Sequence, residues 1–187
     1  NGVDKTEAAL LKMLAMYQRK KPLSESLGKL HIVPVSISYE YDACDVLKAE
    51  ELYQIETTGA FTKTEKSDIE SIVAGMIGYK GAVHVAFGTE VQYESDDPDV
   101  IAASIDKQIL ANYKLRDSNF IALEILKNEG LLPEGVAELD IATPEIADQS
   151  REVFMNRFKQ VDSRLHRHYL LSYANPVISY YRIQSLA

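Results

Sequence analysis

The sequence lacks tryptophan, contains a single cysteine, Cys44, and has only nine glycines and six prolines among its 187 residues. A lone cysteine cannot form an internal disulfide, so the sequence predicts a reducing compartment. No apolar run approaches the roughly 18 residues of a membrane-spanning helix, and no signal peptide is visible. No internal repeat or low-complexity segment is present, and no cluster of His, Cys and carboxylates has the spacing of a metal site.

Positive charge is also scarce. Twenty lysines and arginines face 28 acidic residues, which gives a net charge of −8 and a sequence pI near 5.0. General nucleic-acid binding relies on a basic surface, so we expect no nucleic-acid partner. The proportions of hydrophobic residues (46%) and charged residues (26%) are ordinary for a soluble globular protein. Together with the single cysteine, they predict a cytoplasmic protein.

Helical and strand patterns alternate along the chain. Period two predicts strands over residues 31–40 and 82–88, and spacing of three and four predicts helices before, between and after them. The expected helices cover residues 4–20, 45–56, 62–79, 98–113, 118–128 and 144–165, with Asp4 or Thr6 capping the first. The residues from Ser172 onward are expected to form a short helix or arm. The fold class predicted is therefore α/β, with a small mixed sheet flanked by helices and a helical C-terminal part.

The strand over residues 31–40 carries the most information. Its alternation places Val33, Val35 and Ile37 on one apolar face, which we expect to be buried. The other face is small and polar. Pro34 cannot donate a hydrogen bond to a neighbouring strand, so we expect this strand at a sheet edge or at a bulge.

The block Ile32-Val33-Pro34-Val35, with its extension through Tyr39-Glu40-Tyr41-Asp42, resembles a bacterial branch of the glycerolipid acyltransferases. Segments near Asp4-Lys5-Thr6 and Val83–Gly88 extend the resemblance over most of residues 1–120. It implies transfer of an acyl group from acyl-CoA or acyl carrier protein to glycerol 3-phosphate or lysophosphatidate, in phospholipid synthesis. No cofactor is implied. In this family the block lines the substrate or acyl site, a role that the resemblance assigns to Ile32, Val33, Pro34 and Val35.

The family's catalytic His-x-x-x-x-Asp motif is absent. Five positions after the four histidines His31, His84, His166 and His168 stand Ser36, Thr89, Leu171 and Tyr173. We therefore assign no catalytic residue and expect this chain alone to be inactive. Residues 1–130 are expected to be the C-terminal portion of an acyltransferase-like domain, and residues 131–187 a helical tail packed on it. The missing N-terminal part of the same protein is then an expected partner.

Other interpretations stay open. The chain could be a non-catalytic scaffold or regulatory piece, or an unrelated α/β enzyme that uses Glu40 and Asp42 as paired acids. His84 is better explained as an ordinary strand residue than as a base. The basic run Arg19–Lys21 favours a helix C-cap. Its alternative is contact with anionic lipid, which would place the protein peripherally on the inner face of a membrane.

Overall fold

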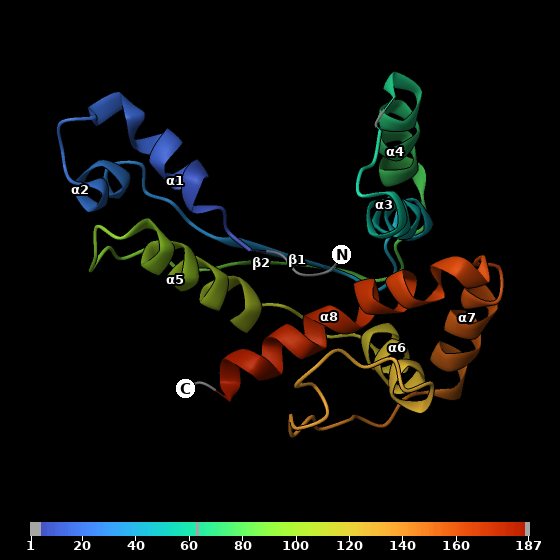
Figure 1. The fold of residues 1–187 in the computed structure, drawn as a ribbon. Helices are drawn as coiled ribbons and strands as arrows, with labels where there is room; N and C mark the ends of the chain where they lie inside the picture. Colours follow the sequence, from blue (N-terminus) through green and yellow to red (C-terminus); the bar gives the residue numbers. More distant parts are fainter. Residues whose placement is uncertain (1–4, 63, 186–187) are drawn as a thin grey trace. The chain divides into compact units, whose positions relative to one another are not determined.

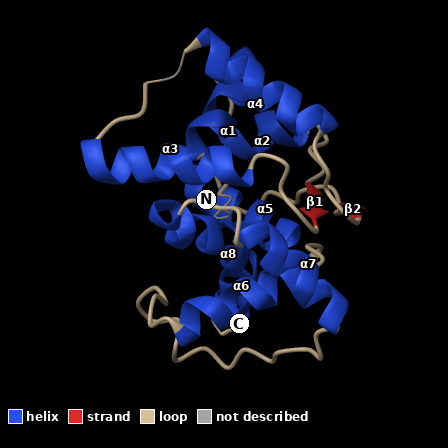
Figure 2. Cartoon of the chain, turned by 90° about the vertical axis from the view of Figure 1, so that its right-hand side faces the viewer, coloured by secondary structure: helices blue, strands red, loops and turns tan. Residues whose placement is uncertain are grey.

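The computed structural model describes residues 5–62 and 64–185, so that Asp4, one expected helix cap, lies outside them. The described chain is dominated by helices, and its only strands pair as a two-stranded antiparallel ribbon (Figure 2). The expected combination of strands and helices is therefore confirmed, whereas the expected mixed sheet is corrected to this ribbon.

The elements follow one another along the chain in Figure 1. They are α1 (Ala8–Leu14), a 3-10 turn (Ala15–Gln18), α2 (Leu23–Gly28), β1 (Val35–Tyr39), α3 (Asp45–Thr58), α4 (Glu65–Ile77), β2 (Val83–Phe87), α5 (Pro98–Ala111), α6 (Asp117–Asn128), α7 (Asp148–Phe158), a second 3-10 turn (Ser163–Leu165) and α8 (His166–Gln184). The short helix α2 lies between the expected helix over residues 4–20 and the expected strand over residues 31–40, where no helix is predicted.

The chain folds as two compact units, each assembled from separate segments. One comprises residues 39–83 and 115–185 and is called here the helical unit; the other comprises residues 5–38 and 84–114 and is called the ribbon unit. These units divide the chain differently from the expected boundary after residue 130. The expected boundary after residue 130 follows from the resemblance to a family and not from which residues pack together, so it stays a prediction.

The core of the helical unit is built around α8. Its buried residues recur at helical spacing, and α6 and α3 pack against it. Phe154 of α7 is fully buried, with its ring 5.3 Å from that of Tyr173 in an edge-to-face arrangement. Apolar area and ring geometry therefore hold α7 to α8.

The end of the chain differs from expectation. The predicted helix over residues 144–165 is two pieces, because the Asp162 carboxylate accepts a hydrogen bond from the Arg164 amide at 3.0 Å and starts a new turn. The residues from Ser172 onward, predicted as a short helix or arm, are helical, but they belong to the longer 19-residue helix α8, which contains Pro176. Proline normally disrupts a helix interior, but Pro176 is buried among the apolar residues of this helix, and their packing offsets the lost hydrogen bond.

In the ribbon unit, α1 packs on α5, and Leu11 of α1 and Ala15 of the following 3-10 turn share a buried cluster with Ile101 and Ile105. Thr6 does not cap α1. Its hydroxyl and its amide both donate to the Asp106 carboxylate of α5, at 2.7 and 2.9 Å, and so tie the start of the chain to that helix.

The ribbon is paired in a single register. The Gly88 amide donates to the Pro34 carbonyl at 2.8 Å, which sets Val35 opposite Phe87 and Ile37 opposite Val85. All four of these side chains project from one face, and they are 39%, 73%, 46% and 49% exposed. The alternation predicted from the sequence is confirmed, but the prediction that Val33, Val35 and Ile37 are buried is wrong.

The opposite face of the ribbon is the buried one. Ser36 and Ser38 are 2% and 0% exposed, and the Ser38 hydroxyl accepts a hydrogen bond from the Lys114 amide at 2.9 Å. The small serine side chains let the backbone at Lys114 approach this face closely. The sequence pattern predicts the wrong buried face because the rule that apolar residues point inward takes no account of a distant amide. Here the Lys114 amide donates to Ser38 and covers the polar face.

Candidate functional site

The four residues assigned to a substrate site do not share one face. Ile32 packs against the core of the ribbon unit and Pro34 is buried, whereas Val33 and Val35 are exposed. Pro34 stands immediately before β1. Its carbonyl accepts a hydrogen bond from the Gly88 amide, but Pro34 has no N–H with which to donate a second hydrogen bond to Gly88. Because β1 belongs to a two-stranded ribbon, it is an edge strand, as the sequence predicts from Pro34.

The exposed half of this block belongs to a larger surface. Val33, Val35 and Ile37 of the first strand region lie with Val85 and Phe87 of β2 on the outer side of the ribbon. We call these five residues the apolar ribbon face. An exposed row of branched and aromatic side chains is a candidate surface for an apolar ligand or partner.

Glu40 and Asp42, the alternative pair of acids, serve the local backbone. Glu40 accepts a hydrogen bond from the Ala82 amide at 2.8 Å and occupies the space beside Gly81. Gly81 has a φ of +62°, and a Cβ there would meet the Glu40 carboxylate at 2.5 Å. Asp42 accepts from the Cys44 amide at 2.8 Å and pairs with Lys48. The two carboxylates therefore accept hydrogen bonds from two different backbone amides.

Two histidines have carboxylate partners that the sequence analysis did not identify. His31 Nδ1 lies 2.8 Å from Glu90, in an exposed pair. His168, which is largely buried, places Nε2 2.8 Å from Glu56. Neither partner is at the family's spacing, so neither pair reproduces the missing motif.

A buried polar cluster joins three helices of the helical unit. Asp45 at the start of α3 is 5% exposed and accepts hydrogen bonds from the Tyr173 hydroxyl at 2.7 Å and from the Arg157 guanidinium at 3.0 Å. Arg157 also lies over the Tyr41 ring, 4.9 Å from its centroid. Partners separated by more than 100 positions leave no local signal in a sequence. The arrangement is that of a structural clamp.

Burial around this cluster affects its tyrosines. Burial, then the Glu40 charge, raises the pKa of Tyr41 to about 12, and burial with the nearby Asp45 charge raises the pKa of Tyr173. Because the folded pKa of Tyr41 exceeds the ordinary value of about 10, the stability that this group contributes is complete below pH 10 and is lost as pH rises through about 12. The raised pKa of Tyr173 acts in the same direction.

We therefore expect the melting temperature to fall between about pH 10 and pH 12, together with late ionisation of these tyrosines. Melting temperature and tyrosinate absorbance should be recorded in parallel. Tyr41→Phe should make the alkaline decline shallower. Titration of all tyrosines near their ordinary pKa, with no change in melting temperature, would contradict this prediction.

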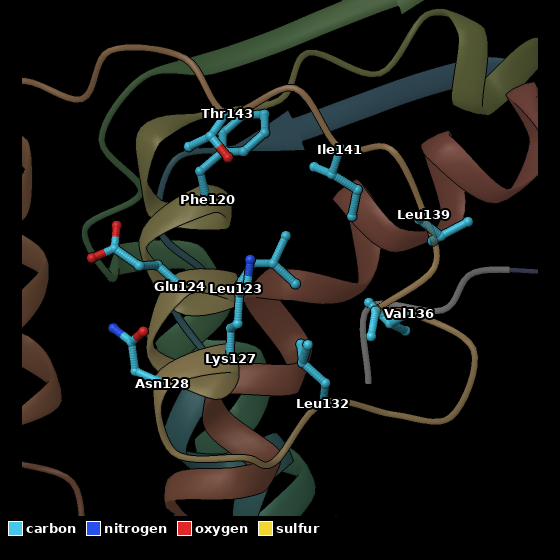
Figure 3. A pocket seen from close by; sticks show the side chains of 11 residues that line it. Phe120, Leu123, Glu124, Lys127, Asn128, Leu132, Val136, Leu139, Ile141 and Thr143 are labelled. Carbon is cyan, nitrogen blue, oxygen red and sulfur yellow. The ribbon is translucent and has the colours of Figure 1, made fainter.

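A cavity of about 460 Å³ lies beside α6, and we call it the α6 cavity (Figure 3). The apolar residues around it are Phe120, Leu123, Leu132, Val136, Leu139 and Ile141. Those after Leu131 come from the long segment between α6 and α7, which has no helix or strand of its own. The sequence analysis missed this site, although a long apolar connection without regular structure is itself a signal of a binding loop.

Within residues 5–62 and 64–185, no three His, Cys, Asp or Glu side chains converge as a metal site would require. Over the same residues, no helix is both long and apolar enough to cross a bilayer.

Comparison with known proteins does not identify the chain. It matches no protein-family model, and neither the curated proteins nor the solved structures include a significant match.

Proposed function

We propose that this chain is part of an acyltransferase that moves an acyl group from acyl-CoA or acyl carrier protein to the hydroxyl of glycerol 3-phosphate or lysophosphatidate. The observation that carries the proposal is the apolar ribbon face. Val33 and Val35 of the block that resembles the family's acyl site are exposed there beside Ile37, Val85 and Phe87. An acyl chain, or the part of the enzyme that holds it, would remove this area from water at about 25 cal/mol per Å².

The chemistry is proposed to come from residues outside this chain. The family's base is a histidine oriented by an aspartate five positions later, and no histidine here has that partner. The ribbon then acts as one wall of the site. Pro34 contributes indirectly, because it has no N–H to donate to Gly88 and so removes one hydrogen bond between the strands next to Val33 and Val35.

Val35→Glu tests the wall in the complete protein, once its upstream coding sequence has been read. Val35 is 39% exposed and Val153 of α7 is 38% exposed, so Val153→Glu is a matched control. A carboxylate on the acyl wall should lower kcat/KM by tenfold or more, roughly 1.4 kcal/mol, while the control stays near wild type. The assay is thiol release from acyl-CoA with glycerol 3-phosphate, where the chain alone should show only background.

Three results would count against the proposal. The first is an upstream sequence without His-x-x-x-x-Asp, which favours the scaffold or regulatory alternative. The second is turnover by the isolated 187-residue chain, which would direct attention to His31 and His168. The third is full activity of Val35→Glu at an unchanged melting temperature, which would leave the ribbon as scaffold alone.

A peripheral contact with anionic lipid is a second part of the proposal. In α1 and the following turn, only a narrow stripe is buried, and Leu10, Met13, Leu14, Met16 and Tyr17 are each about half exposed. The same surface carries the exposed cations Lys12, Arg19, Lys20 and Lys21, and residues 8–21 contain no acidic residue. Basic charge beside exposed apolar side chains is the composition of an interfacial helix.

Sedimentation with phosphatidylglycerol vesicles tests this contact. Each cation near an anionic surface contributes about 1 kcal/mol, so Arg19→Gln with Lys20→Gln should weaken binding roughly 30-fold. Lys107→Gln with Lys159→Gln, which removes two exposed cations elsewhere, is the control and should bind as wild type does. Equal binding by both double variants, or equal binding to phosphatidylcholine vesicles, would favour the helix C-cap interpretation.

A further inference from the structure

The α6 cavity is lined by none of the residues Ile32, Val33, Pro34 and Val35 that the acyltransferase resemblance assigns to the substrate site. Its volume of about 460 Å³ falls within the range of about 300–1,000 Å³ that is usual for small-ligand sites. We propose that it binds an amphipathic anion, namely a carboxylate with one unbranched apolar tail. The proposal goes beyond the acyl-transfer function and does not depend on it.

The apolar part of the site is formed by two opposed surfaces. Phe120 and Leu123 of α6 are 7% and 9% exposed and form one side. Figure 3 shows Val136, Leu139 and Ile141 of the connecting segment on the other side, with the cavity between them. An unbranched hydrocarbon tail fits the slot between these apolar side chains.

The connecting segment is held in place before any ligand binds. Val136 is 3% exposed, and its amide donates to the Pro133 carbonyl at 3.3 Å. Two residues of α8 fasten the same segment: the Arg182 guanidinium donates to the Glu134 carbonyl at 3.0 Å, and the Tyr181 hydroxyl to the Ala142 carbonyl at 3.2 Å. A preformed wall reduces the ordering cost of binding.

The charge expected of the ligand follows from the charged residues of α6. Glu124 is neutralised by a bidentate pair with Arg151 of α7, at 3.0 and 2.8 Å, and this pairing lowers the pKa of its carboxyl. Lys127 has no ion-pair partner in the described part of the chain, and it lines the cavity one turn from Leu123. In Figure 3 its side chain runs along α6 toward Leu123, so its ammonium can meet an anionic head above the apolar slot.

Calorimetric titration with decanoate and with decanol, below their aggregation limits, tests tail and charge separately. Decanoate should bind the wild-type chain at one saturable site, roughly tenfold tighter than decanol, since a charge-assisted hydrogen bond is worth about 1.5 kcal/mol. Lys127→Met should reduce decanoate affinity to that of decanol and leave decanol unchanged. Lys159→Met, an exposed lysine of the same unit that does not line the cavity, is the control.

Leu139→Trp should fill the slot and abolish binding of both compounds at an unchanged melting temperature. If that variant is unstable, Ile141→Trp on the same wall replaces it. The proposal is overturned if decanoate shows no saturable binding, if Lys127→Met binds decanoate as tightly as the control does, or if a folded filled-cavity variant still binds. None of these results alters the acyl-transfer assay, so the two proposals fail separately.

Discussion

Replacing Asp45 by asparagine should lower the free energy of unfolding of the helical unit by about 2–4 kcal/mol. Removing one partner of a buried ion pair costs about 3–5 kcal/mol, because the other charge stays buried without compensation. The lower range allows for water, since the Arg157 side chain is 30% exposed. Asparagine keeps the volume of aspartate, so the loss reflects charge and hydrogen bonding to Arg157 and Tyr173.

Glu124→Gln is the matched control for that experiment. It makes the same change from carboxylate to amide beside an arginine, but both partners of the pair with Arg151 are 40% exposed. Its cost should be no more than about 1 kcal/mol. Urea unfolding followed by circular dichroism measures both. Adding Arg157→Met to Asp45→Asn should recover part of the loss, whereas fully additive costs would show that the two groups are not coupled.

Truncation of Phe154 to alanine should cost about 3–5 kcal/mol, the largest effect expected from an apolar change in this protein. Phe154 is fully buried, and its ring contacts those of Phe158, Tyr169 and Tyr173, with centroids 5.3–6.5 Å apart. Its removal leaves a cavity that surrounding rings cannot fill without leaving their rotamers.

Val153→Ala is the neighbouring control for this truncation. Val153 precedes Phe154 in α7 but is 38% exposed, so its shortening should change the free energy of unfolding by less than about 1 kcal/mol. Thermal and urea unfolding of both variants give the comparison. Similar small losses for the two positions would mean that α7 does not anchor the core of the helical unit.

Local patterns predicted much of the secondary structure. Alternation identified both strands, and the helical spacing of Ile101, Ile105 and Ile109 identified α5. Local patterns failed where a distant group decided the outcome. Ser38 is buried because the amide of Lys114, 76 positions later, donates to its hydroxyl. Within α8, Pro176 is retained because packing from other helices offsets its helix-breaking tendency.

The candidate sites also depend partly on local sequence patterns and partly on long-range contacts. The block around Pro34 is visible in the sequence, but the alternation of its side chains between a buried and an exposed face is decided by the core of the ribbon unit. The α6 cavity depends on Val136 and Leu139 folding back on α6, and the Asp45 clamp joins residues 112 positions apart. Long-range pairing of this kind has no period for a sequence pattern to detect.

The two-stranded ribbon has a further consequence for its backbone. In the observed register, the amides and carbonyls of Ser36 and Ser38 are used between the strands, whereas those of Val35 and Ile37 point outward along an open edge. A third strand laid along this edge would pair with those outward groups. Its own alternate side chains would extend the apolar ribbon face, so one addition would satisfy hydrogen bonding and widen the hydrophobic surface together.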